Sequence, residues 1–269
     1  MFGLFRVAGS AFLMLLIIIL THFLIDESLP DHVRETAKQR KSGCRGACTA
    51  GNPISAFQAL GRTPLLTGIG WVFFVLHVGY MGSSGLGALY TELVWGWEAL
   101  EQGEVGTPMR MTQILCLFVI IPLVVRKLGE RKALYIACAG RAIGYGVFQG
   151  LSALPAFPIR VQQVMWVIGG CEFLVGQATS PICRAIASRT AGEHEQGIVL
   201  GALGIAETFA SVLSPLAMNT IYSDTVEWYP GFGYFVSGTF PAIALFSSFC
   251  LPEWEDVSDG ASESDPSVE

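Results

Sequence analysis

The stretch Arg126-Lys-Leu-Gly-Glu-Arg-Lys132 decides how this chain folds, because it places a dense basic cluster between two long apolar runs. The runs cover roughly residues 108–125 and 133–151, and each is long enough to cross about 30 Å of hydrocarbon as a helix. The cluster has four Lys or Arg in seven residues and is too costly to bury in lipid. The three segments together predict two membrane-spanning helices joined by a short loop.

The composition points to a membrane protein over the whole chain. Of the 269 residues, 52% are hydrophobic and 14% are charged, whereas a soluble domain has about 25% charged residues. The mean hydropathy is +0.51, and apolar runs of about 20 residues recur along the chain. Only helices and closed barrels satisfy their backbone in lipid, and barrels need short alternating segments. The sequence therefore predicts an all-α, polytopic helical membrane protein.

The distribution of basic residues sets the orientation of these spans. Twelve of the 16 Lys and Arg residues fall in segments between predicted spans. Because cytoplasmic loops are enriched in Lys and Arg, we expect these segments inside and the amino terminus outside. The expected parts are a first transmembrane helix at 1–26, a cytoplasmic basic loop at 27–62, a six-helix transmembrane bundle at 63–251 and an acidic, disordered cytoplasmic tail at 252–269.

Proline positions suggest where several of these helices begin and end. Thr63-Pro64 and Thr107-Pro108 each fit an N-cap followed by proline at the first helical position. The segment 89–106 between them has four Glu and no Lys or Arg, so we expect an outer loop there. Ser180-Pro181 is expected to end the fifth span, and 184–196 to form an inner loop.

Small residues recur at every fourth position in the span that follows Thr63. Gly79, Ser83 and Gly87 would lie along one side of that helix. Association of helices in lipid depends on close approach of their backbones, which small side chains permit. We therefore expect this strip to pack against a neighbouring helix.

Charged residues inside predicted spans are the first candidates for function, because a charge at a span centre costs about 2.5 to 3.5 kcal/mol on insertion. Glu172 and Glu207 lie near the middle of the fifth and sixth spans. Either could exchange protons or meet a cationic substrate, and either could form an internal salt bridge. Arg141 near mid-membrane in the fourth span and Arg110 just inside the outer end of the third are available as partners.

Uncharged polar residues within the spans are further candidates. His77 is the one histidine in an apolar run. It fits either a buried neutral imidazole with a backbone partner or a proton carrier that works near neutral pH. Gln113 and Gln177 are candidates for the substrate pathway, although such amides commonly hydrogen-bond to adjacent helices instead.

Several short motifs, taken in order, resemble those of the major facilitator superfamily. Asp26-Glu-Ser-Leu-Pro30 resembles the exit of helix six in these transporters. Tyr90-Thr-Glu-Leu-Val-Trp-Gly-Trp97 resembles the outer segment after helix seven. Ser188-Arg189, followed by Glu195-Gln196-Gly197, resembles the junction of helices ten and eleven in drug-efflux and solute-carrier branches, including tetracycline-exporter-like members.

The basic loop also resembles a motif that this superfamily repeats between helices eight and nine. Gly129, Arg131 and Lys132 agree with it, and the resemblance implies that they form a gating loop. Arg126 replaces the usual Asp, and Glu130 replaces an Arg. The resemblance therefore does not imply a gating ion pair built on the missing Asp.

The resemblance implies a fold and a function. Members have twelve spans in two six-helix halves and bind substrate near the bilayer midplane between them. This chain then resembles the carboxy-terminal half with one preceding helix, acting as part of a larger or paired transporter. The implied activity is transport of a small organic solute by alternating access, with proton coupling left open. Helix nine is usually peripheral in the family, so Arg141 is expected to be structural.

The sequence also argues against several other classes. It has no phosphate loop, nucleophile elbow or zinc-ligand spacing, so we expect no enzymatic catalysis, no metal, no cofactor and no nucleic-acid partner. A non-transporting seven-span receptor or membrane scaffold is the alternative, although the usual receptor motifs are missing. The expected partners are the lipid bilayer, a small solute, protons and a second half-transporter. The sequence names neither the solute nor the membrane.

Overall fold

The computed structural model describes residues 15–16, 19, 58–191 and 195–252, without the side chain of Phe173. The chain divides into two units, Met1–Asn52 and Pro53–Glu269, and only the second is described over most of its length. Every element in this described part is helical, which confirms the all-α fold class. The tail from 253, the loop up to 57 and most of the expected first span lie outside the described residues.

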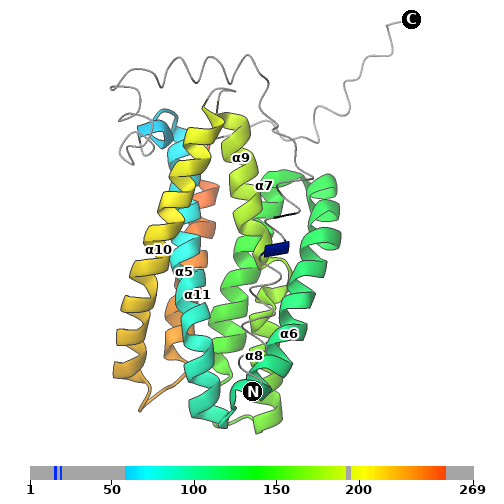
Figure 1. The fold of residues 1–269 in the computed structure, drawn as a ribbon, viewed down its shortest axis with the longest axis vertical. Coiled ribbons are helices and arrows are strands. Elements are labelled where there is room, and N and C mark those ends of the chain that lie inside the picture. The colour runs from blue at the N-terminus through cyan, green and yellow to red at the C-terminus, as the bar shows by residue number, and fades with distance from the viewer. Residues whose placement is uncertain (1–14, 17–18, 20–57, 192–194, 253–269) are drawn as a thin grey trace, which may run out of the picture. The chain divides into compact units, whose positions relative to one another are not determined.

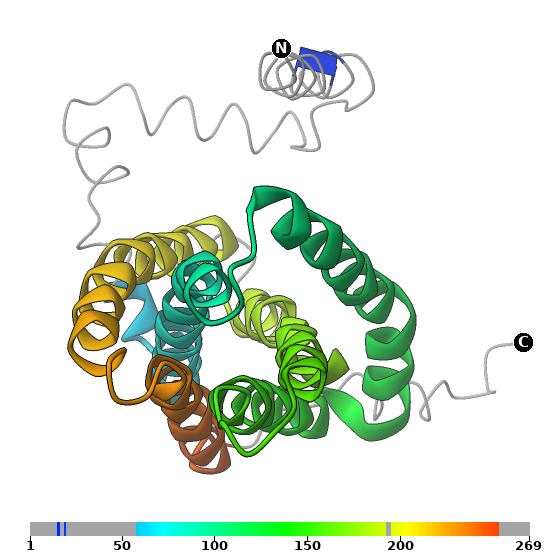
Figure 2. The same cartoon turned by 90° about the horizontal axis from the view of Figure 1, so that it is seen from below.

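Four described stretches are long and apolar enough to cross a membrane: Pro64–Trp95, Ala99–Gln149, Gln196–Thr225 and Phe232–Phe249. The first is α5 (Pro64–Trp95), whose start confirms the predicted cap. Thr63 accepts a hydrogen bond from the Leu66 backbone N–H, and Pro64 occupies the first turn. Helix α5 packs against α9, α10 and α11 and so lies inside the bundle (Figures 1 and 2).

The second predicted Thr-Pro start is wrong. The helix begins at Ala99, after Gly96 reverses the chain with φ 68°, and it continues through Pro108. Glu98 and Glu101 form a capping box at this earlier start, so most of the expected outer loop at 89–106 is helical. The bounds in this part of the chain are α6 (Ala99–Leu115), the π-helix η1 (Cys116–Ile120), α7 (Ile121–Ala142) and the π-helix η2 (Ile143–Gln149).

The chain reverses within α7, inside the basic stretch from which the fold was inferred. Gly129 has φ 79° and ψ 164°, a left-handed conformation that glycine adopts without a Cβ clash. Figure 1 shows α6 before this turn and the later part of α7 after it, running in opposite directions along the bundle. The predicted helical hairpin is therefore present, with its turn reduced to a kink at one residue.

The fifth span consists of two helices with an irregular segment between them. Its parts are α8 (Ile159–Gly170), the 3-10 turns η3 (Glu172–Leu174) and η4 (Gly176–Ala178), and α9 (Thr179–Thr190). The sequence predicted a continuous span ending at Ser180-Pro181, which is wrong, because Pro181 lies in the first turn of α9. Proline is tolerated there because that turn has unpaired N–H groups. Arg184 and Arg189 consequently lie on helix α9 and not in a loop.

Helices α10 (Gln196–Thr225) and α11 (Phe232–Phe249) complete the bundle. Two apolar clusters hold the described helices together. One contains Ile69, Phe73, Leu134, Ile186 and Leu203, and the other contains Leu86, Tyr90, Trp166, Met218 and Tyr234. Between these clusters the structure is polar, and the candidate site lies there.

Candidate functional site

The candidate site is built around the break in the fifth span. Glu172 and Leu174 have φ of 49° and 65°, the two positive values among the described non-glycine residues. Such conformations cost about 1 to 3 kcal/mol each and persist only where the surroundings enforce them. Irregular backbone at membrane depth is tolerated where it is buried in protein or lines a cavity. Glu172 is therefore held in place by its neighbours.

Glycines allow the break to lie close to η2. A Cβ on Gly169 would come 2.6 Å from Gln149 Cγ, and a Cβ on Gly144 would come 3.0 Å from the Gly169 carbonyl oxygen. A Cβ on Gly176 would come 2.8 Å from Glu172 Cβ. The missing side chains let the two backbones approach, which brings the Glu172 carboxylate to the side chains of α7 and η2.

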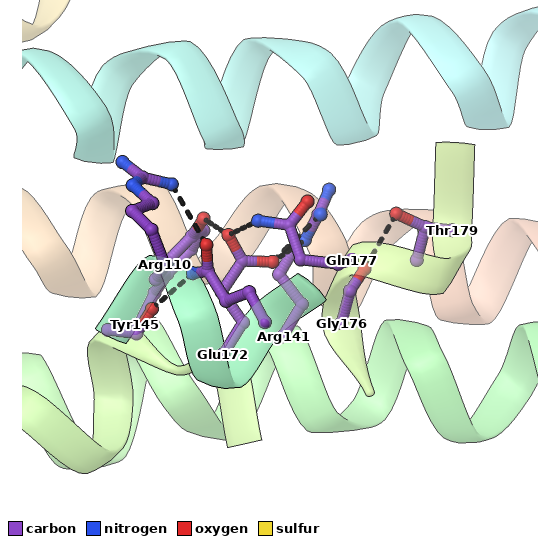
Figure 3. A network of polar contacts seen from close by, with 9 residues as sticks. Arg110, Arg141, Tyr145, Glu172, Gly176, Gln177 and Thr179 are labelled. Carbon is purple, nitrogen blue, oxygen red and sulfur yellow. Dashed lines mark hydrogen bonds and ion pairs between the residues drawn. The ribbon is translucent and has the colours of Figure 1, made fainter. Parts of the chain in front are cut away.

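The Glu172 carboxylate is fully partnered in the interior of the bundle (Figure 3). Arg141 donates to Oε2 at 2.8 Å, and Tyr145 and Gln177 donate to Oε1 at 2.8 and 2.9 Å. Glu172 and Arg141 are only 2% and 3% exposed. The sequence left two alternatives for Glu172: contact with protons or a cationic substrate, and an internal salt bridge. The geometry supports the internal salt bridge. Arg141, expected to be structural, is its partner and also lies 5.3 Å from the centre of the Tyr80 ring.

A cavity of about 80 Å³ lies beside this cluster, between α5, α6, η2, α8 and α11. Glu172 and Gln149 are among the residues that line it. Gln149 is 4% exposed, and its Oε1 has no hydrogen-bond partner among the described residues. The remaining polar or aromatic lining residues are Tyr80, Ser83, Ser84, Arg110, Gln113, Tyr145, Trp166 and Tyr234.

Arg110 lies farther along its helix than the sequence predicted, and its side chain is exposed. It is eleven residues from Ala99, the first residue of α6, or about 16 Å along the axis, because the helix starts well before Pro108. Its Nη1 donates to Gln113 Oε1 at 3.1 Å, and Gln113 Nε2 donates to the Gly170 carbonyl at 2.6 Å. Arg110, Gln113 and the broken span are thus linked at the cavity (Figure 3).

His77 and Glu207 form a second polar cluster, with Arg184. Arg184 Nη2 donates to Glu207 Oε2 at 2.5 Å, and His77 Nε2 lies 3.6 Å from Glu207 Oε1. His77 Nδ1 lies 2.8 Å from the Phe73 carbonyl oxygen. A carbonyl oxygen can only accept, so Nδ1 carries the proton and Nε2 faces the carboxylate.

The expected gating residues lie at one end of the bundle, around the kink of α7. Arg131 donates to the Tyr135 hydroxyl and to the Leu251 carbonyl oxygen, which ties the kink to the end of α11. Glu130, where the family motif usually has Arg, is paired with Arg189 of α9. Lys132 is exposed. The structure therefore places Gly129, Arg131 and Lys132 together, away from the cavity.

The sequence analysis missed Tyr145, Gln149 and Arg184. Tyr145 follows Arg141 by four residues, a spacing that puts both side chains on one helix face and was available as a signal. Arg184 was assigned to a loop because α9 was not foreseen. No group of three His, Cys, Asp or Glu in the described part of the chain could hold a metal ion.

Comparison with known proteins identifies the family to which this chain belongs. The family model of the Major Facilitator Superfamily matches residues 3–215. The chain belongs to the Major Facilitator Superfamily. Together with its long apolar helices, this membership makes it an integral, multi-pass membrane protein. The resemblance stated from its motifs is confirmed, and two of the proteins that it matches are named as a symporter and as an MFS-type transporter.

Three relatives show how far the similarity extends. The lysosomal proton-coupled steroid conjugate and bile acid symporter SLC46A3 of Rattus norvegicus is 38% identical over 80 residues, 29% of this chain and 17% of that protein. The human protein of that name is 28% identical over 116 residues, 42% of this chain and 25% of its own length. The class E tetracycline resistance protein of Escherichia coli is 26% identical over 182 residues, 67% of this chain and 42% of that protein. The chain thus spans less than half of each relative.

Proposed function

We propose that the protein transports a small organic solute across a membrane by alternating access, and that protons drive the movement. The observation that carries this proposal is the broken fifth span beside a polar cavity. Secondary transporters typically build substrate sites from discontinuous helices near the bilayer midplane. Residues from α5, α6, η2, α8 and α11 face this cavity, so a solute bound there would contact several separate elements.

The cluster of His77, Glu207 and Arg184 supports proton coupling. With Nδ1 of His77 committed to the Phe73 carbonyl, an unprotonated Nε2 would face an ionised carboxylate. One added proton converts this repulsive contact into an attractive one, on either the imidazole or the carboxyl group. A proton on Glu207 would also weaken its ion pair with Arg184 and release that side chain. Proton binding therefore changes the contacts between α5, α9 and α10.

The proposal also includes a second six-helix unit that completes the transporter and an orientation of the chain in the membrane. We expect the six-helix bundle to work with another six-helix unit, because members of the family bind substrate between two halves. Exposed apolar side chains on α10 are available for such a contact: Phe209, Val212, Leu213 and Leu216. The excess of Lys and Arg in the loops around Gly129 and before α5 favours a cytoplasmic carboxyl terminus.

Uptake into proteoliposomes tests the proposal. The native full-length product is reconstituted with its second half, and uptake of two solutes is measured with and without a pH gradient: cholate, a bile acid, and tetracycline. These are solute classes that the names of two relatives give. We expect protein-dependent uptake of at least one solute, accelerated by the gradient.

Glu207→Gln should remove the response to the gradient, because the variant cannot exchange a proton at this position. Glu104→Gln is the matched control, since Glu104 is an exposed residue of α6 away from the cluster. Equal gradient dependence in wild type and in Glu207→Gln would contradict proton coupling at this site. The absence of any protein-dependent uptake would contradict transport itself.

A further inference from the structure

We infer that Gln113 is a positioning residue of the cavity: it holds the peptide unit at which α8 ends and thereby keeps Glu172 in its strained conformation. This inference rests on the proposed function for the part that the cavity plays in transport. Gln113, Gly170 and Glu172 all line that cavity. A displacement of the chain between Gly170 and Glu172 would therefore change the surface that is offered to a solute.

Helix α6 meets the broken fifth span at Gly170. The two buried residues of α6 are Met109 and Gln113. A Cβ on Gly170 would collide with Met109 Cε, so the missing side chain allows α6 to approach. Gln113 Nε2 donates to the Gly170 carbonyl oxygen at 2.6 Å, whereas Met111 and Ile114 of the same helix are exposed. The position of α6 and the geometry of the break therefore depend on the same contact.

The peptide unit between Gly170 and Cys171 is held on both sides. Helix α8 ends here, and the last carbonyl groups of a helix have no partner within it. The Cys171 N–H donates to the Val167 carbonyl oxygen at 3.0 Å, and the Gly170 carbonyl oxygen accepts from the amide of α6. Because a peptide unit is planar, these two bonds fix its orientation. Glu172 follows directly with φ 49°, a conformation that persists only while its surroundings enforce it.

Both partners of the Gln113 side-chain amide require the same orientation. The Gly170 oxygen can only accept, so Nε2 must face it. The Arg110 guanidinium can only donate, and its Nη1 lies 3.1 Å from Gln113 Oε1. Gln113 is 6% exposed, so its amide is also shielded from water that could replace these bonds. A side chain of similar length without an N–H would remove this donor from the Gly170 carbonyl.

Labelling of Cys171 tests whether Gln113 holds this peptide unit. Cys171 is partly buried, and the exposed Cys250 serves as the internal reference. The purified full-length protein in detergent is treated with N-ethylmaleimide, and the labelling of each cysteine is followed over time by mass spectrometry of its peptide. Relative to Cys250, we expect Cys171 to react about 2- to 10-fold faster in Gln113→Met than in the wild type, because the loss of one net hydrogen bond favours local opening by about this factor.

Gln162→Met is the matched control. Gln162 is also a buried glutamine whose Nε2 donates to backbone carbonyl groups, those of Leu154 and Phe157 at 2.9 and 3.1 Å, but it lies near the start of α8. This variant should lower the unfolding temperature as Gln113→Met does and leave the labelling of Cys171 unchanged. Gln113→Asn is a second test variant, whose amide is one methylene group shorter, and it should also accelerate the labelling. It replaces Gln113→Met if that variant does not fold.

Solute uptake separates this inference from the proposed function. In the proteoliposome assay, Gln113→Met should raise KM, because solute binding must then also order the break. The acceleration by the pH gradient should stay unchanged, since His77 and Glu207 are not altered. Gln162→Met should change neither quantity.

Three results would overturn the inference: equal labelling of Cys171 in the wild type and in the Gln113 variants, equal acceleration in Gln162→Met, or an unchanged KM in a Gln113 variant that labels faster. The first two are independent of transport. If Cys171 responds as expected and no protein-dependent uptake is found, the proposed function fails and the link between α6 and the break stands.

Discussion

A buried charge is acceptable in this protein only where each of its polar atoms has a partner. Glu172 shows this most clearly, because Arg141, Tyr145 and Gln177 together occupy both oxygens of its carboxylate. The energetic value of such a pair lies mainly in the penalty for breaking it, since a lone charge would remain in a dry interior. Variants of Arg141 and Glu172 therefore test whether this pair holds the broken fifth span in its conformation.

Replacing Glu172 by Gln should destabilise the protein by about 3 to 5 kcal/mol, because the Arg141 guanidinium would remain buried without a counter-charge. The measurement is the free energy of unfolding in detergent, followed by tryptophan fluorescence against denaturant. The double variant Arg141→Met/Glu172→Leu should lose much less than the sum of its single variants, because it removes both charges.

The exposed pair of Arg62 and Glu195 is the control for this experiment, since their side chains are 55% and 38% exposed. Arg62→Gln should change the free energy of unfolding by no more than about 1 kcal/mol. If Glu172→Gln has an equally small effect, the pair does not hold the break in place.

Among the helices, the two Thr-Pro sequences show how far local patterns predict structure. Thr63 uses its hydroxyl to accept from the Leu66 N–H, as an N-cap does. Thr107 instead donates its hydroxyl to the Gly103 carbonyl at 2.8 Å, one turn back within an existing helix. The dipeptide is the same, and the difference is the capping box upstream, which starts α6 earlier. The positions of the spans were therefore predictable from the sequence. The start of α6 was not, because the capping box of Glu98 and Glu101 competes with Thr107-Pro108.

The broken fifth span lay beyond what the sequence could indicate. Glu172 and Gln177 were recognised as candidates from their types and positions, but their conformation depends on contacts with residues distant in the chain. The positive φ of Glu172 is maintained by Arg141 and Tyr145, which precede it by 31 and 27 residues. Hydropathy reports only that the whole stretch is apolar, so a continuous helix was the natural expectation.

The predicted strip of small residues on α5 gives an element-level test. A Cβ on Gly79 would lie 2.9 Å from the backbone oxygen of Ser237 and 3.1 Å from Pro241 Cδ, both on α11. Gly79→Ala should lower stability by about 1 to 3 kcal/mol, because a backbone atom cannot move aside easily. The unfolding temperature in detergent, followed by circular dichroism, measures the effect.

Gly85→Ala is the matched substitution on the same helix, because a Cβ there would meet no atom within 4 Å. It should leave the unfolding temperature unchanged or raise it slightly, since alanine favours helix more than glycine does. Equal effects of the two substitutions would show that α5 and α11 are not in close contact.

At the scale of the whole molecule, we propose that the chain forms part of a larger or paired transporter. Its matches cover less than half of each of the three relatives described. We therefore predict that an antibody to residues 253–269 detects either a product of about twice 29.0 kDa or a complex in which this chain is paired with a second unit. Immunoblots after denaturing and native electrophoresis distinguish these forms. A lone 29.0 kDa monomer under native conditions would contradict the proposed second half.

The same antibody tests the orientation, because the basic loops are expected to share the cytoplasmic side with the tail. It should stain cells, or organelles that carry the protein, only from the cytoplasmic side of the membrane. An antibody to an epitope inserted between α10 and α11 is the comparison, and it should bind from the opposite side. Staining of the tail from the non-cytoplasmic side would reverse the proposed topology.

The continuity of α5 has a mechanical consequence for the two polar clusters. His77 lies three residues before Tyr80, and Ser83 and Ser84 follow within two turns, all on one helix from Pro64 to Trp95. An unbroken helix rotates or shifts as a rigid rod over such short distances. A displacement of His77 on protonation would therefore also move Tyr80, Ser83 and Ser84, which line the cavity. Proton binding and solute binding would thus act on two parts of the same rigid helix.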